Sequence, residues 1–152
     1  MGKRFEEQGK GIKSCYYLNE DDLANYKLKL SDHDRVAKAY IWKAGDGEEG
    51  ILSSLIDGRT RHESQEEAIE AWQKSIARMA GSTLVKEDWQ VEYPIRLEVY
   101  SMKYPSMGVF QYMVFTQHHT YTGFTLIGLK TDSEEVIKDL AGLIANKMAA
   151  CD

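Results

Sequence analysis

The sequence predicts an α+β fold in which a mostly antiparallel sheet carries two helices packed on one face. Strict alternation of apolar and polar residues indicates two half-buried strands, at residues 26–30 and 95–99. Two later segments, 62–81 and 130–149, change to the spacing of amphipathic helices. Because strands are grouped before each helix and do not alternate with helices one by one, they favour an antiparallel sheet.

Six further segments are predicted strands because they are rich in β-branched and aromatic residues and are separated by turn residues: 12–18, 36–42, 51–57, 89–93, 109–116 and 121–129. The sequence KYPSMG, residues 103–108, predicts a turn between two of them. Its Pro105 fixes φ, and its Gly108 permits positive φ.

Both predicted helices begin with a capping box, formed by Ser64 with Glu67 in the first and by Thr131 with Glu134 in the second. Trp72 lies in the middle of the apolar face of the first helix and is expected to anchor it in the core. Aligned at a shift of 68 residues, the two helices share acidic and apolar positions, which suggests a duplicated strands-then-helix unit. Any two capped amphipathic helices would share the same features, so both explanations stay open.

The length of 152 residues suits one domain, and we expect a flexible N-terminal segment at 1–10 followed by a single α+β domain at 11–150. No apolar run approaches the ~20 residues that cross a bilayer, and the first ten residues lack the apolar part of a signal peptide. These features predict a cytoplasmic protein with no membrane partner. Cys15 and Cys151 are expected to be reduced.

The net charge of −5 and the pI of about 5.4 argue against nucleic acid as a partner, since such binders cluster Lys and Arg. Residues 44–70 hold far more acidic than basic side chains. This segment is either a solvated loop followed by the acidic first turn of a helix, or an acidic surface that docks a basic partner protein.

The stretch FTQHHTYTGF, residues 115–124, contains the adjacent His118 and His119. In an extended chain their side chains would point to opposite faces and could not bind one metal ion, and no further ligand stands at metal-binding spacing. We therefore predict a turn or strand end there, and neither a metal nor a cofactor. A pocket at the end of the sheet built from His118, His119 and His33 with carboxylates is the alternative, and would suit an enzyme or a small-ligand-binding domain.

The stretch GDGEEG, residues 45–50, matches the glycine spacing of dinucleotide-binding loops. Such loops lead into a helix whose N-terminus meets the phosphates, whereas a strand is predicted after this one. Its acidic residues would also repel phosphate. A hairpin loop is therefore predicted.

The preferred function is that of an inhibitor, immunity factor or adaptor that binds a protein partner, and the acidic segment favours a basic one. It rests on missing catalytic motifs, the acidic segment and aromatic residues of the kind enriched at interfaces. The candidate partner-binding residues combine acidic and aromatic side chains with one arginine: Asp46, Glu48, Glu49, Tyr40, Trp42, Arg96 and Tyr100.

Overall fold

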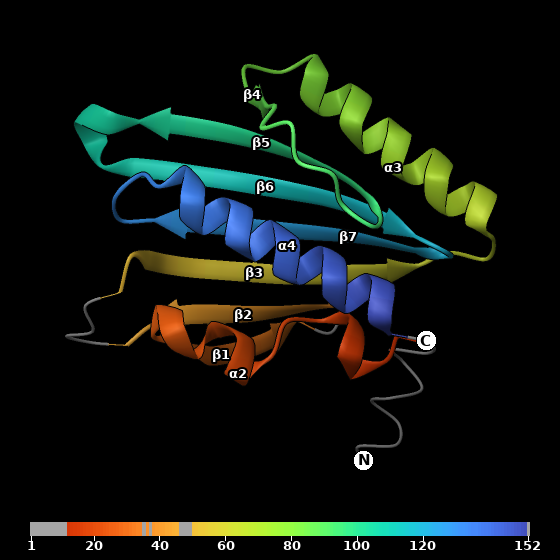
Figure 1. The fold of residues 1–152 in the computed structure, drawn as a ribbon, viewed down its shortest axis with the longest axis horizontal. Helices are drawn as coiled ribbons and strands as arrows, with labels where there is room; N and C mark the ends of the chain where they lie inside the picture. Colours follow the sequence, from red (N-terminus) through yellow and green to blue (C-terminus); the bar gives the residue numbers. More distant parts are fainter. Residues whose placement is uncertain (1–11, 35, 37, 46–49, 152) are drawn as a thin grey trace.

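The computed structural model describes residues 12–34, 36, 38–45 and 50–151 of the chain. They form a seven-stranded antiparallel sheet in the order β1-β2-β3-β7-β6-β5-β4, with helices packed against it (Figure 1). The strands are β1 (Leu28–Asp34), β2 (Ala39–Ala44), β3 (Leu52–Arg61), β4 (Val85–Glu87), β5 (Arg96–Tyr104), β6 (Val109–His118) and β7 (Tyr121–Leu129). The predicted α+β class and antiparallel sheet are confirmed. The predicted flexible segment 1–10 lies outside the described residues.

Two antiparallel meanders make up the sheet, β1–β2–β3 and β4–β5–β6–β7, and they join where β3 pairs with β7. Residues 45–51 connect the antiparallel pair β2 and β3, as the predicted hairpin loop requires, although 46–49 are not among the described residues. The turn predicted at 103–108 is also present, with Gly108 at φ 66°.

The helices α3 (Gln65–Ala80) and α4 (Glu134–Ala150) occupy the two segments with helical spacing. Ser64 caps α3, since its side chain accepts a hydrogen bond from the N–H of Glu67 at 3.1 Å. The cap predicted for the second helix is wrong. Ser133 and not Thr131 caps α4, because it directly precedes the first turn and its hydroxyl accepts from the N–H of Val136.

One face of the sheet, here called the α4 face, carries the main core. Tyr112, Val114 and Ile127 project to it and are buried against the inward residues of α4, among them Ile144 and Met148. The hydroxyl of Thr116, on the same face, donates to Sδ of Met148 at 3.1 Å. Figure 1 shows α4 lying across the central strands of this face.

The helix α3 packs on the opposite face, here called the α3 face. Phe115 projects there because it neighbours Val114 and Thr116 on one strand, and side chains alternate along a strand. The indole N–H of Trp72 in α3 reaches the carbonyl of Phe115 at 3.1 Å. The structure therefore does not confirm two helices on one face.

The duplicated strands-then-helix unit is not confirmed either. A duplication that made β3 equivalent to β7 would relate the halves by a two-fold axis perpendicular to the sheet, because these adjacent strands are antiparallel. Such an axis keeps both helices on one face, whereas α3 and α4 lie on opposite faces.

The segment at 12–18 is not the strand that its composition predicts. It contains the short 3-10 helix η1 (Ser14–Tyr16) and lies on the α4 face, outside the sheet. Its backbone bonds to side chains of β3 in place of a neighbouring strand: Nε of Arg59 donates to the carbonyl of Tyr16 at 2.9 Å, and Asp57 accepts from the N–H of Leu18 at 2.8 Å. Residues 89–93 are likewise a loop, which packs against the α4 face, and the short β4 was not predicted.

Asp57 and Arg59 form a fully buried ion pair in the centre of the molecule, with 2.6 Å between Oδ1 and Nη1. The hydroxyl of Thr125 donates to the same carboxylate at 2.8 Å. The Arg59 guanidinium also lies 5.4 Å from the centre of the Tyr17 ring, and burial raises the pKa of Tyr17 well above its usual value. A network of this kind joins the N-terminal segment to the strands.

A disulfide links Cys15 to Cys151, so the prediction of reduced cysteines is wrong. The two residues are 136 apart in sequence, and only the packing of η1 beside the end of α4 brings their Cα atoms to 5.6 Å. The disulfide thus joins the N-terminal segment covalently to the end of α4.

Replacing Asp57 with Ala should lower the free energy of unfolding by about 3–5 kcal/mol, because Arg59 would be left as an uncompensated buried charge. The double variant Asp57→Leu/Arg59→Met should be less destabilised than the single variant, since it removes both charges. Urea denaturation measures both. A double variant that is the less stable of the two would contradict the buried-pair account.

The variant Cys15→Ser/Cys151→Ser should unfold with a free energy about 2–4 kcal/mol lower, because the unfolded chain regains the freedom that the cross-link removes. Reducing agent should lower the melting temperature of the wild-type protein but not that of the variant. Equal melting temperatures of the wild type with and without reductant would contradict a structural disulfide.

Candidate functional site

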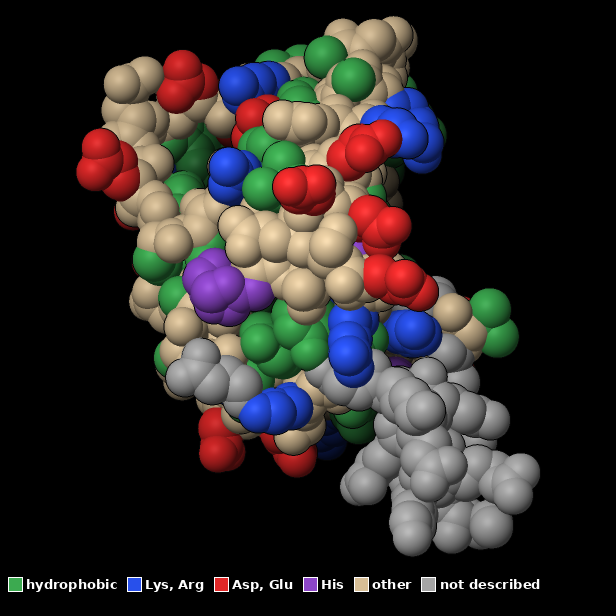
Figure 2. Space-filling view, turned by 90° about the vertical axis from the view of Figure 1, so that its right-hand side faces the viewer, with side chains coloured by type: hydrophobic (Ala, Val, Ile, Leu, Met, Phe, Trp, Pro, Cys, Tyr) green, Lys and Arg blue, Asp and Glu red, His purple; other side chains and the backbone are tan. Residues whose placement is uncertain are grey.

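A pocket opens at the end of the sheet where β6 turns into β7, and it contains the two adjacent histidines. Its volume is about 410 Å³, and its lining comes from the start of α3, the segment leading into β5 and the end of β6: Gln65, Pro94, Ile95, Arg96, Gln117, His118 and His119. Figure 2 looks onto this end of the molecule and shows histidine side chains gathered on the surface.

The turn predicted at the histidines is confirmed, but the predicted separation of their side chains is wrong. His118 is the last residue of β6, and His119 lies in the turn with φ 52°, a left-handed conformation. This conformation ends the extended chain and brings the two ring centres to 3.9 Å. The side-chain amide of Gln117, itself buried, donates to the carbonyl of His119 at 2.7 Å and holds the turn.

The other two histidines lie outside the lining of this pocket. His33 stacks on Tyr40 of the neighbouring strand, with 4.2 Å between ring centres. His62 contacts the hydroxyl of Thr122 at 2.9 Å. No carboxylate lines the pocket among the residues that the structure describes. His33 is therefore not brought to the pair formed by His118 and His119, and the carboxylate of the expected combination is not among the described lining residues.

Of the residues predicted to bind a partner, the four that the structure describes do not form one surface. Trp42 and Tyr100 are buried, on opposite faces of the sheet, and the pKa of Tyr100 is raised to about 12 by burial and by its hydrogen bond to Glu98. Tyr40 is half-buried between Tyr17 and His33. Arg96 lines the histidine pocket. Asp46, Glu48 and Glu49 lie outside the described residues.

Part of the α3 face is left open by its helix. A row of directly paired apolar side chains crosses four strands on this face, and each of them is only half-buried: Met113, Leu126, Ile56 and Ile41. Beside this row lies Phe124, with 37% of its surface exposed. Trp72 is also only half-buried and lies outside the main core, so the prediction that it anchors that core is wrong.

A hollow of about 350 Å³ runs along this open part of the α3 face. Phe124 pairs with Gly58, and Gly58 pairs with Ala39 on the next strand. The two small residues leave space beside the large Phe124 side chain, and all three line the hollow. Trp72 and Ser75 of α3 form one side of it. A concave, mostly apolar surface with a few polar groups is typical of binding sites.

Acidic residues flank the open apolar surface. Asp32 and Asp34 of β1 pair with Ile41 and Ala39, so they project to the same face, and both are exposed. On the other side, the first turns of α3 carry exposed acidic residues: Glu66, Glu67 and Glu70. Lys29, near the start of β1, and Lys43, near the end of β2, pair with each other and also project to this face.

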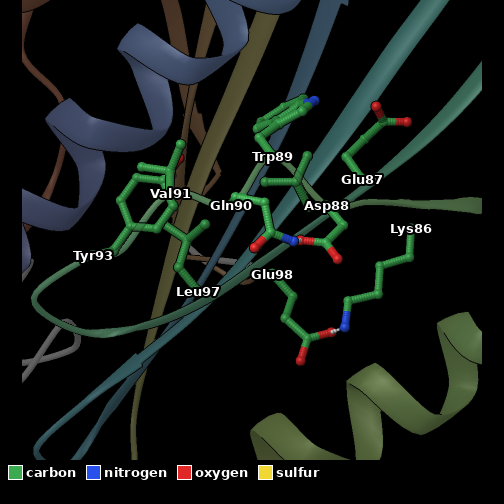
Figure 3. Close-up of a pocket in the computed structure, with 10 residues that line it drawn as sticks. Lys86, Glu87, Asp88, Trp89, Gln90, Val91, Tyr93, Leu97 and Glu98 are labelled. Carbon is green, nitrogen blue, oxygen red and sulfur yellow. Dashed lines mark hydrogen bonds and ion pairs between the residues drawn. The ribbon is translucent and has the colours of Figure 1, made fainter.

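A third pocket, of about 240 Å³, lies beside the edge strand β4. Figure 3 shows Lys86 and Glu98 joined on one side of it, at 3.5 Å, and Trp89, Tyr93 and Leu97 on the other. The indole N–H of Trp89 and the hydroxyl of Tyr93 are buried without a hydrogen-bond partner in the structure, and burial raises the pKa of Tyr93. Since both atoms are closed off from solvent, they do not face a ligand entering this pocket.

Sequence reasoning missed the Asp57–Arg59 pair and the open part of the α3 face. A signal for the pair was present, because two opposite charges two residues apart on one strand share a face. The open apolar row gave no such signal. An apolar residue in a strand has the same sequence pattern whether or not another part of the chain packs over it.

Within the described ranges, no three His, Cys, Asp or Glu side chains come together in a way that could hold a metal ion. No helix in the described part of the chain is long and apolar enough to span a membrane. The chain matches no family model, no curated protein and no solved structure.

The variant His119→Gly should raise the free energy of unfolding by up to about 1 kcal/mol, because glycine adopts positive φ without steric cost. The matched variant His119→Val should lower it, since a β-branched residue is poorly accommodated there. Urea denaturation distinguishes the two. Equal stability of the glycine and valine variants would contradict the left-handed turn.

Proposed function

We propose that this protein acts by binding another protein, as an inhibitor, immunity factor or adaptor does. The supporting observation is the open part of the α3 face, where Phe124 and Ile56 line a mostly apolar hollow next to α3 and the rest of the half-buried row lies beside it. Sheet domains usually bury each apolar face under a second layer. A partner that covers this surface would complete that layer.

The partner should present apolar side chains flanked by basic residues. Its apolar part would pack on Phe124, Leu126 and Ile56, where burial supplies the driving force. Its basic residues would approach Asp32 and the acidic turns of α3, which favours a basic partner by charge complementarity. The basic partner expected from the acidic segment 44–70 is thus proposed again, with the α3 part of that segment and Asp32 as the acidic residues that it would approach.

A catalytic role receives less support. The described lining of the histidine pocket lacks the carboxylate that the enzyme alternative requires.

The predicted cytoplasmic location fits poorly with the Cys15–Cys151 disulfide, because cytosolic thiols are kept reduced. We therefore place the action of the protein in an oxidising compartment.

Photo-crosslinking from the proposed surface tests this function. A photoreactive amino acid at position 124 should give a discrete adduct with one partner in cells that make the protein naturally. The same amino acid at Met107, an exposed apolar residue in the turn between β5 and β6, is the matched control and should not give that adduct.

The variant Phe124→Asp should abolish co-purification of the same partner while leaving the fold intact, because an exposed site tolerates a charge but an apolar interface does not. Circular dichroism and thermal melting check the fold. No adduct at position 124, or identical adducts from 124 and 107, would contradict the proposal.

A further inference from the structure

The histidine pocket at the end of the sheet is built from side chains that can carry positive charge. Arg96, His118 and His119 all line it, and none of its lining residues is acidic. The side-chain amides of Gln65 and Gln117 belong to the same lining. Guanidinium, imidazole and amide N–H groups are all hydrogen-bond donors, so the pocket offers donors to one ligand from three parts of the chain.

Arg96 is the permanent charge of this group. Its guanidinium has no hydrogen-bond or ion-pair partner among the residues that the structure describes. Glu98 lies two residues along the same face of β5. Its carboxylate forms an ion pair with Lys86 at 3.5 Å and accepts a hydrogen bond from the hydroxyl of Tyr100 at 3.1 Å. Arg96 is thus available to an anion from outside.

The two histidines are held in place before any ligand arrives. The buried amide of Gln117 fixes the carbonyl of His119, and the left-handed turn sets the rings 3.9 Å apart. Positive φ at a non-glycine residue is a strained conformation of the kind found at functional sites.

Other chemistries suit this pocket less well. A metal site would need further ligands, and the described residues place no third His, Cys, Asp or Glu beside the pair. General acid–base catalysis by a histidine and a carboxylate lacks its carboxylate in the lining. Oxyanion recognition, in contrast, uses the groups that are present, since Arg binds phosphate and carboxylate through paired N–H groups.

We propose that the pocket formed by Arg96, His118 and His119 binds the phosphate or carboxylate group of a small ligand. Arg96 supplies the charge, and His119 and Gln65 supply further donors. This pocket lies at the end of the α3 face and shares no lining residue with the hollow beside Phe124, so it does not depend on partner binding there.

Titration with inorganic phosphate and with acetate, at constant ionic strength and mildly acidic pH, tests the proposal. Imidazole resonances in NMR spectra report on each histidine. We expect saturable shifts at His118 and His119, with His33 unaffected because it stacks on Tyr40 outside the pocket. A tighter response to phosphate identifies a phosphate ligand, and a tighter response to acetate identifies a carboxylate ligand.

The variant Arg96→Gln should weaken the tighter of these two anions about tenfold or more, because it removes a charged hydrogen-bond donor. The matched control Arg78→Gln, which removes the same charge from an exposed position in the last turn of α3, should leave the affinity unchanged. Circular dichroism checks that both variants fold. Non-saturable shifts, equal shifts at His33, or equal weakening by the two variants would overturn the proposal.

Discussion

The buried pair of Asp57 and Arg59 is the interaction on which the arrangement of this protein depends. It lies on the inner strand β3, and its polar atoms form hydrogen bonds with the backbone of Tyr16 and Leu18 and with the hydroxyl of Thr125. The N-terminal segment is thereby fixed on the α4 face, where its aromatic residues join the main core. Burying a charge without hydrogen-bond partners is very unfavourable. The ion pair therefore depends on the hydrogen bonds that the N-terminal segment supplies, and the segment depends on the same bonds for its position.

Two other features follow from this arrangement. Gly123 leaves room for the Arg59 side chain, since a Cβ at that position would meet Nη1 of Arg59 at 3.3 Å and would collide with the hydroxyl of Thr116. Cys15 lies in the segment that the pair fixes, which places it beside the end of α4 for the disulfide. Ion pair and disulfide therefore hold the same N-terminal segment, one by polar contacts and the other covalently.

The two faces of the sheet are consequently unequal. The α4 face is closed by α4, by the N-terminal segment and by the 89–93 loop, whereas the α3 face has one helix for the width of seven strands. The apolar row from Met113 to Ile41 remains half-buried for this reason. The proposed partner surface is thus a consequence of how the chain distributes its covering elements, and the anion pocket arises separately where the turn after β6 meets the start of α3 and the segment before β5.

The sequence by itself determined the α+β class, the antiparallel sheet, both long helices and the turns at 103–108 and 118–119, because these depend on local periodicity, capping residues and turn chemistry. The sequence-based prediction failed at residues 12–18, whose composition is typical of a strand. The backbone of this segment forms hydrogen bonds with the side chains of Asp57 and Arg59 in place of a neighbouring strand. Tertiary structure alone decided which face each helix covers, that Cys15 meets Cys151, that Trp42 and Tyr100 are buried, and that His118 and His119 share a pocket with Arg96. Each of these depends on contacts between residues distant in sequence or on a single left-handed residue, and neither leaves a periodic signal in the chain.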